Sequence, residues 1–83
     1  MKIKTLFFGG LKSQIGYEEK TVELTQQDLS VEALFCQCLA DQNQLKQSWQ
    51  PKVLYAVNQE QVDGDTIIKD GDEVAFMPPM AGG

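Results

Sequence analysis

The residues most suited to chemistry stand at the end of the sequence, which closes with Met80-Ala81-Gly82-Gly83 directly after Pro78-Pro79. Glycine lacks a Cβ, so a Gly-Gly end can thread a narrow channel and adopt backbone angles that are closed to other residues. It also presents an unhindered carboxylate that another enzyme could activate. A frayed chain end is the alternative that this segment alone leaves open.

The amino-acid composition of the chain argues against most other kinds of reactive site. The chain of 83 residues contains no His, which is the commonest general base and metal ligand. Cys36 and Cys38 would point about 200° apart on a helix and could not form a disulfide there. A zinc site would depend on carboxylates, which structural zinc sites rarely use. We therefore expect no metal site and no bound cofactor, and a redox role for the two cysteines stays open beside a purely structural one.

Charge narrows the possible partners. The chain carries 12 acidic residues against seven basic ones, all of them Lys, for a net charge of −5. Without a basic patch, nucleic-acid binding through phosphate neutralisation is not expected, whereas an acidic surface favours basic protein partners. No apolar run approaches the ~20 residues of a membrane span, and the start lacks the features of a signal peptide. The sequence predicts one cytoplasmic domain without membrane contact.

The first half of the chain predicts two strands and a helix. Residues 2–8 alternate as a strand, Gly9-Gly10 ends it, and a short helical turn over 11–15 leads to a second strand over 17–24. Ser30 is a good N-cap, and apolar residues at helical spacing then predict the main helix over 31–42. A second short helix should hold Leu45 and Trp49 and end before Pro51.

The second half predicts three more strands. The apolar run over 53–57 suits a buried strand, residues 61–62 a short one, and residues 73–77 the last, which Pro78-Pro79 ends. Ile67 and Ile68 should fill the core, and Gly71 should supply the positive φ of a turn.

This order predicts an α+β fold of the β-grasp type: a mixed sheet of about five strands with one main helix packed on one face. The domain should span residues 1–79, followed by a flexible tail over 80–83. If the first and last strands are neighbours, Phe8 and Met77 meet on the face away from the helix, with Leu6 and Ala75 beside them. Exposed apolar patches of this kind usually mark a partner surface. The alternative is that these residues only form the outer margin of the hydrophobic core.

Several segments in order carry a resemblance to a known family. They are Leu6-Phe7-Phe8, Val31-Glu32-Ala33-Leu34, Ala56-Val57-Asn58-Gln59, and Asp70-Gly71-Asp72-Glu73-Val74-Ala75-Phe76 followed by Pro78-Pro79 and Gly82-Gly83. Together they resemble the small, sulfur-carrier subunit of molybdopterin synthase over essentially the whole chain. The last 14 residues are the most specific part of the pattern.

The resemblance implies a ubiquitin-like fold and a definite chemistry. An E1-like adenylyltransferase would use ATP to adenylate the Gly83 carboxylate, and a sulfurtransferase would supply the sulfur that makes it a thiocarboxylate. The tail would then enter the large catalytic subunit, in a heterotetramer, and donate sulfur to cyclic pyranopterin monophosphate during molybdenum cofactor biosynthesis. Gly82 would give a slender approach. Partner contacts are implied for Leu6, Phe8, Gln61, Ala75, Met77, Pro78, Pro79, Met80 and Ala81.

Two other functions stay open at this point. One is a sulfur carrier of another pathway, such as thiamine thiazole, thionucleoside or cysteine synthesis. The other is a ubiquitin-like modifier or interaction module whose Gly83 forms an amide with a lysine. An enzyme acting alone is not expected, because no general acid–base pair can be identified.

Overall fold

The computed structural model describes residues 1–16 and 18–79. The predicted tail over 80–83 therefore lies outside the described residues. The elements, in chain order, are β1 (Lys2–Phe7), α1 (Gly9–Ile15), β2 (Glu19–Glu23), α2 (Val31–Cys38), α3 (Asn43–Trp49), β3 (Leu54–Val57), β4 (Glu60–Val62) and β5 (Glu73–Met77).

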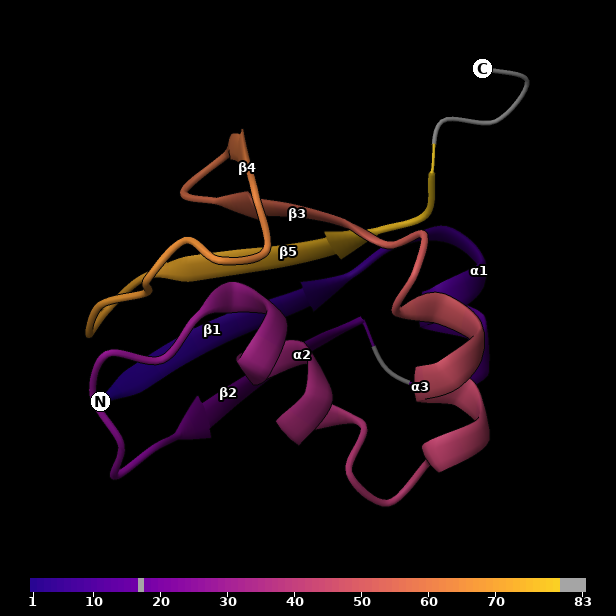
Figure 1. The fold of residues 1–83 in the computed structure, drawn as a ribbon, viewed down its shortest axis with the longest axis horizontal. Coiled ribbons are helices and arrows are strands. Elements are labelled where there is room, and N and C mark those ends of the chain that lie inside the picture. Colours follow the sequence, from indigo (N-terminus) through magenta and orange to yellow (C-terminus); the bar gives the residue numbers. More distant parts are fainter. Residues whose placement is uncertain (17, 80–83) are drawn as a thin grey trace.

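The strands form one mixed sheet in the order β2-β1-β5-β3-β4, with the helices gathered on one side of it (Figure 1). β1 and β5, the first and last strands, lie side by side and parallel, and the other neighbours are antiparallel. This is the ubiquitin-like β-grasp fold that the sequence predicts. We call the face of the sheet opposite the helices the open face.

Alternation along β1 and β5 separates the core from the open face. Ile3, Thr5 and Phe7 are fully buried, as expected for residues that share one side of a strand. The Phe7 and Phe76 ring centroids lie 5.2 Å apart, and Phe35 of α2 lies 5.1 Å from Phe76. The buried Thr5 hydroxyl donates to the Lys20 carbonyl at 2.6 Å. The inner side of the sheet is therefore closed by packing.

The main helix, α2, begins as predicted and ends early. The Ser30 hydroxyl accepts a hydrogen bond from the Ala33 amide at 3.1 Å, which confirms the N-cap. The predicted end at residue 42 is wrong, because α2 ends at Cys38 and Leu39 leaves helical geometry with φ −109° and ψ 23°. Leu39 is fully buried. The chain turns there instead of continuing the helix.

The helical layer contains more than the one main helix expected. The predicted turn over 11–15 is a complete helix, α1, which starts at Gly9, and α3 confirms the second short helix. The Trp49 indole donates to the Gln14 side-chain oxygen at 2.7 Å, which ties α3 to α1. Both helices are therefore parts of the layer that covers the sheet.

One core prediction fails in part. Ile68 is 2% exposed, as expected, whereas Ile67 is 47% exposed. Ile67 pairs with Ser30 in an isolated antiparallel bridge. Consecutive residues of extended chain point to opposite sides, so only Ile68 reaches the core.

None of the helices in the described ranges combines the length and the apolar character that crossing a membrane requires.

Candidate functional site

Four apolar side chains meet on the open face, where β1 and β5 run side by side. Leu6 lies directly opposite Ala75 in the parallel ladder. Phe8 follows β1 and is 42% exposed, while Leu6, Ala75 and Met77 are half-buried. We call these four residues the open-face patch. The structure thus brings together the four residues that the alternation pattern grouped.

The patch forms one side of a shallow hollow of about 400 Å³. Across the sheet, Leu6, Ala75, Ala56 and Gln61 stand opposite one another in a single row over four strands. Two alanines occupy the middle of this row, so their short side chains leave the depression. The lining residues are Leu6, Phe8, Ala56, Gln59, Gln61, Glu73, Ala75 and Met77.

Three of these lining residues were not identified from the sequence. Ala56 stands inside an apolar strand, and only its pairing with Ala75 places it on the open face. Glu73 shares the open face of β5 with Ala75 and Met77. Gln59 stands in the tight turn between β3 and β4, where Asn58 and Gln59 both adopt positive φ, 52° and 72°. Two successive residues with positive φ are the signature of a type I′ hairpin turn. The geometry of this turn was not predicted from the sequence.

The end of β5 is held against the start of α1. The Phe8 amide donates to the Phe76 carbonyl at 3.1 Å. Gly9 has φ +61°, and a Cβ placed on it would lie 2.9 Å from Cγ of Pro78. Pro78 therefore packs closely on the Gly9 backbone and leaves no space there for a side chain, while Pro79 is exposed. This contact fixes where the chain leaves the sheet, at the edge of the open-face patch.

The remaining predicted site residues, Met80, Ala81, Gly82 and Gly83, lie outside the described residues. Their roles stay predictions.

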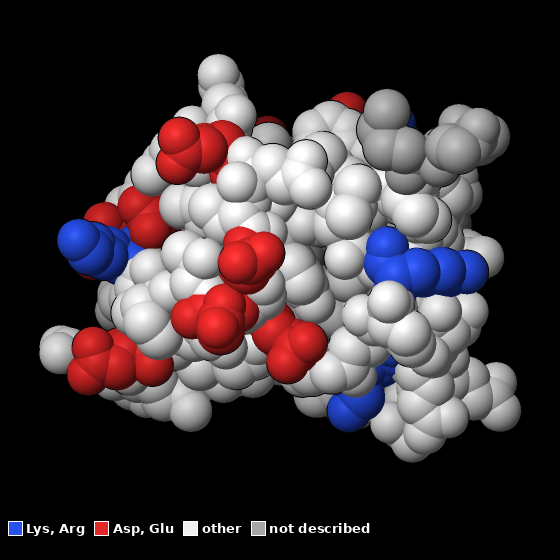
Figure 2. All heavy atoms as spheres, turned by 45° about the horizontal axis from the view of Figure 1, so that its top comes forward, with Lys and Arg blue, Asp and Glu red and all other residues white. Residues whose placement is uncertain are grey.

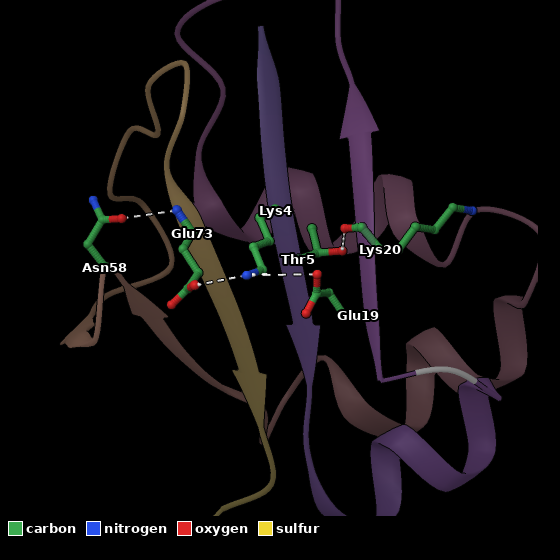
Figure 3. Close-up of polar contacts among 6 residues, drawn as sticks. All are labelled: Lys4, Thr5, Glu19, Lys20, Asn58 and Glu73. Atoms are coloured by element: carbon green, nitrogen blue, oxygen red, sulfur yellow. Dashed lines mark hydrogen bonds and ion pairs between the residues drawn. The ribbon is translucent and has the colours of Figure 1, made fainter.

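Beyond the patch the open face is charged. The Lys4 ammonium lies 3.7 Å from a Glu73 carboxylate oxygen and 3.8 Å from one of Glu19, so it bridges three strands (Figure 3). Carboxylates dominate the surface more widely, and Figure 2 shows several of them gathered on one half of a face. Exposed pairs of this kind add little to stability, about 0–1 kcal/mol each. The main effect of these carboxylates is to make the electrostatic potential of the surface around the hollow negative.

The strongly perturbed pKa values of the described residues belong to groups on the helix side. Burial raises the pKa of the Cys38 thiol to about 11, so this thiol is protonated at neutral pH. Burial, followed by the charges of Glu32 and Cys36, raises the pKa of Tyr55 to about 12. Within residues 1–16 and 18–79 there is no cluster of three or more His, Cys, Asp or Glu side chains that could hold a metal ion. The hollow itself combines the apolar open-face patch with polar side chains at its border, a composition suited to docking a partner surface.

Comparison with known proteins identifies the family of this chain. Residues 5–83 match the ThiS family. The chain belongs to the ThiS family. Within it, the chain is 38% identical to the molybdopterin synthase sulfur carrier subunit of Chlamydomonas reinhardtii, over the whole of both chains. It is also 38% identical to the protein of the same name from Escherichia coli (strain K12), covering 98% of this chain and 99% of that one.

A solved structure shares the fold of this ThiS-family chain. It is the complex of subunits 1 and 2 of the molybdopterin-converting factor from Helicobacter pylori. The matching chain there aligns with a TM-score of 0.64 and 24% identity over 100% of both chains.

Proposed function

We propose that this chain is the sulfur-carrier subunit of a molybdopterin synthase and acts in molybdenum cofactor biosynthesis in the cytoplasm. The observation that carries the proposal is the joint position of the open-face patch and the end of β5. Pro78 packs on Gly9 beside Phe8 and Met77, so a partner that covers the patch also receives the chain beyond Pro79. The full-length similarity to two molybdopterin synthase sulfur carrier subunits supports the same role.

Activation begins at the Gly83 carboxylate. A carboxylate is a poor electrophile because oxide is a poor leaving group. An E1-like adenylyltransferase joins the carboxylate to the AMP part of ATP and releases pyrophosphate. The persulfide of a sulfurtransferase then attacks the adenylated carbonyl and displaces AMP, which departs with one carboxylate oxygen. A thiol reductant cleaves the resulting acyl disulfide and leaves a thiocarboxylate. The carrier binds no cofactor of its own, and ATP is bound and consumed by the activating partner.

Transfer takes place in the large catalytic subunit. The thiocarboxylate sulfur is the nucleophile that attacks cyclic pyranopterin monophosphate, where a carbon–sulfur bond replaces a carbon–oxygen bond. Water then hydrolyses the thioester between carrier and pterin, which returns Gly83 to a carboxylate, and two carriers supply the two dithiolene sulfurs of each molybdopterin. Four residues beyond Pro79 span roughly 13 Å when extended, enough to enter a pocket of a docked subunit. The small Gly82 and Gly83 pass where a side chain would not. The solved complex of two molybdopterin-converting factor subunits supports a large-subunit partner, and we expect the two subunits to assemble as a heterotetramer.

The division of roles follows from the residues. The described part of the chain offers a docking hollow, and the sequence offers no phosphate-cradling loop of the kind that binds ATP. Phe8 and Met77, with Gln61 opposite, serve to hold the large subunit or the activating enzyme, which use the same patch in turn. Catalytic groups belong to the partners, so the chain is not an enzyme on its own.

Mass spectrometry of the intact protein tests the activation step. After incubation with ATP, an E1-like adenylyltransferase and a sulfur donor, we expect a mass gain of one oxygen-to-sulfur exchange, located at Gly83 in the C-terminal peptide. A variant lacking Gly83 is the matched control and should gain nothing while keeping its fold. Absence of the gain in the full chain would rule out a sulfur carrier of any pathway.

Copurification distinguishes the pathways. A large molybdopterin synthase subunit recovered with the tagged chain supports the proposal. Recovery of a thiazole synthase, or of proteins joined to Gly83 through a lysine amide, would replace it with one of the alternatives.

A further inference from the structure

The strand β2 forms an open edge of the sheet. It pairs with β1 alone, and no strand of the described residues lies beyond it. The Leu24 amide donates to the Met1 carbonyl at 2.7 Å and the Phe7 amide to the Glu18 carbonyl at 2.8 Å. Because hydrogen-bonding residues alternate in an antiparallel ladder, the backbone groups of Glu19, Thr21 and Glu23 face away from the sheet. These groups can receive another strand.

Charges on the open face alternate in sign from strand to strand and end at this edge. Glu73 of β5 pairs with Lys4 of β1, and Lys4 also pairs with Glu19 of β2 (Figure 3). Beside this row, Lys2 of β1 lies 3.7 Å from Glu23 of β2. Both series therefore stop at β2 with a carboxylate. The charge that would continue each series is positive.

The spacing of the two carboxylates defines a pattern for a partner. Glu19 and Glu23 are four residues apart on one strand, which places them about 13 Å apart on the same face. An added strand would present matching side chains at positions i and i+4. Opposite charges directly across a strand pair stabilise it, and like charges destabilise it.

A groove lies on the other side of the same edge, between β2 and α2. It has a volume of about 290 Å³ and is lined by Lys20, Val22, Glu23, Leu24, Leu34, Gln37, Cys38 and Asp41. Val22, Leu34 and the uncharged Cys38 thiol supply apolar surface, and Asp41 adds a further carboxylate. On an added strand, the residues between i and i+4 would alternate toward this groove. An apolar side chain opposite Val22 fits there.

We propose that the β2 edge binds an extended basic segment of a partner protein as an additional strand. Two basic residues four apart lie opposite Glu19 and Glu23, and an apolar residue between them enters the groove beside Val22. Glu19 stands beside the patch residue Leu6 in the ladder, but the outward backbone groups of β2 point away from the open-face patch, so the proposal does not depend on the sulfur-carrier role. A second copy of the chain fits less well, because antiparallel pairing centred on Thr21 sets Glu19 of each copy against Glu23 of the other.

An NMR titration with amide hydrogen exchange tests the proposal, using the full chain. The probe is a synthetic peptide with Lys-Val-Thr-Val-Lys at its centre, and the control has Glu-Val-Thr-Val-Glu in its place. We expect the lysine peptide to slow exchange of the Thr21 and Glu23 amides while the Leu6 and Ala75 amides are unchanged. The glutamate peptide should bind at least about tenfold more weakly, because two attractive pairs become repulsive.

Two variants make the test specific. The charge reversal E19K/E23K should invert the preference between the two peptides. Thr21→Pro removes a donor that faces away from the sheet, which an edge strand tolerates, so the fold should persist in circular dichroism while binding is lost. Equal binding of both peptides, or unchanged exchange at Thr21 and Glu23, would overturn the proposal. Protection of these amides that rises with protein concentration in the absence of peptide would replace the basic segment with a second copy.

Discussion

Asn58 and Glu73 exchange two hydrogen bonds that join the β3–β4 turn to the start of β5. The Asn58 amide donates to the Glu73 carbonyl at 2.7 Å, and the Glu73 amide donates to the Asn58 side-chain oxygen at 3.0 Å. The Asn58 side-chain amide also donates to Asp72 at 3.0 Å. Since Gln59 and Glu73 both line the hollow, this pairing fixes one wall of the proposed docking site.

Replacing Asn58 should loosen that wall. We expect Asn58→Ala to lower the free energy of unfolding by about 2–3 kcal/mol, because it removes two side-chain hydrogen bonds and places Ala at φ 52°. Asn58→Gly should cost about 1 kcal/mol less, since glycine accepts positive φ. Urea denaturation measures both. Gln59→Gly is the matched control, and it should not destabilise the protein, because Gln59 has φ 72° and its side chain makes no hydrogen bond to the described residues. Equal losses for Asn58→Ala and Asn58→Gly would show that backbone strain plays no part.

Removing the hydroxyl of Tyr55 should stabilise the folded protein. The ring packs edge-on against Phe35 and Phe76, whereas the buried hydroxyl has no hydrogen-bond partner. Leaving a buried polar group unpaired costs about 1–3 kcal/mol. Tyr55→Phe should therefore raise the free energy of unfolding, by about 1 kcal/mol, in thermal or urea denaturation at neutral pH. A loss of stability of that size would mean that the hydroxyl has a partner, such as a bound water.

The thiol of Cys38 should make stability fall in alkaline solution. Burial raises the pKa of this thiol from 9.0 to about 11. The unfolded chain loses the proton first, so the stabilisation is complete below pH 9 and is lost as the pH rises to about 11. We expect the free energy of unfolding to fall by about 2 kcal/mol more in this window than in Cys38→Ala. Identical pH profiles for the two proteins would show that partial burial does not perturb this thiol.

Phe8 and Ile67 provide a matched pair for the docking surface. Both are large apolar residues with similar exposure, 42% and 47%, but only Phe8 belongs to the open-face patch. Phe8→Ala should weaken binding of the large synthase subunit at least about tenfold in calorimetry, because central aromatic residues carry much of an interface's affinity. Ile67→Ala should leave the affinity nearly unchanged. Equal effects of the two substitutions would remove the patch from the interface.

The parts of this fold that could be predicted are those where one local pattern decides the structure. The last strand has the predicted bounds, and the side-chain alternation in β1 and β5 correctly grouped the open-face patch. Ser30 caps α2 as its residue type indicates.

The parts that were missed depend on contacts between distant segments. Gly9 and Gly10 are poor helix formers, yet α1 includes both, because Leu11 and Ile15 are buried and Trp49 packs on Gly10. The early end of α2 follows from the burial of Leu39 in a turn. The position of Ala56 in the hollow follows only from its pairing with Ala75 of a neighbouring strand. None of these relationships is visible in a window of neighbouring residues.

The central claim is that this chain carries sulfur to the large synthase subunit on Gly83. A single-turnover reaction of the thiocarboxylated protein with the large subunit and cyclic pyranopterin monophosphate tests it most directly, with the carrier followed by mass spectrometry. We predict that two thiocarboxylates return to carboxylates for each molybdopterin formed, and that Phe8→Ala slows this conversion while Ile67→Ala does not. Molybdopterin formed while the thiocarboxylate stays intact would contradict the account.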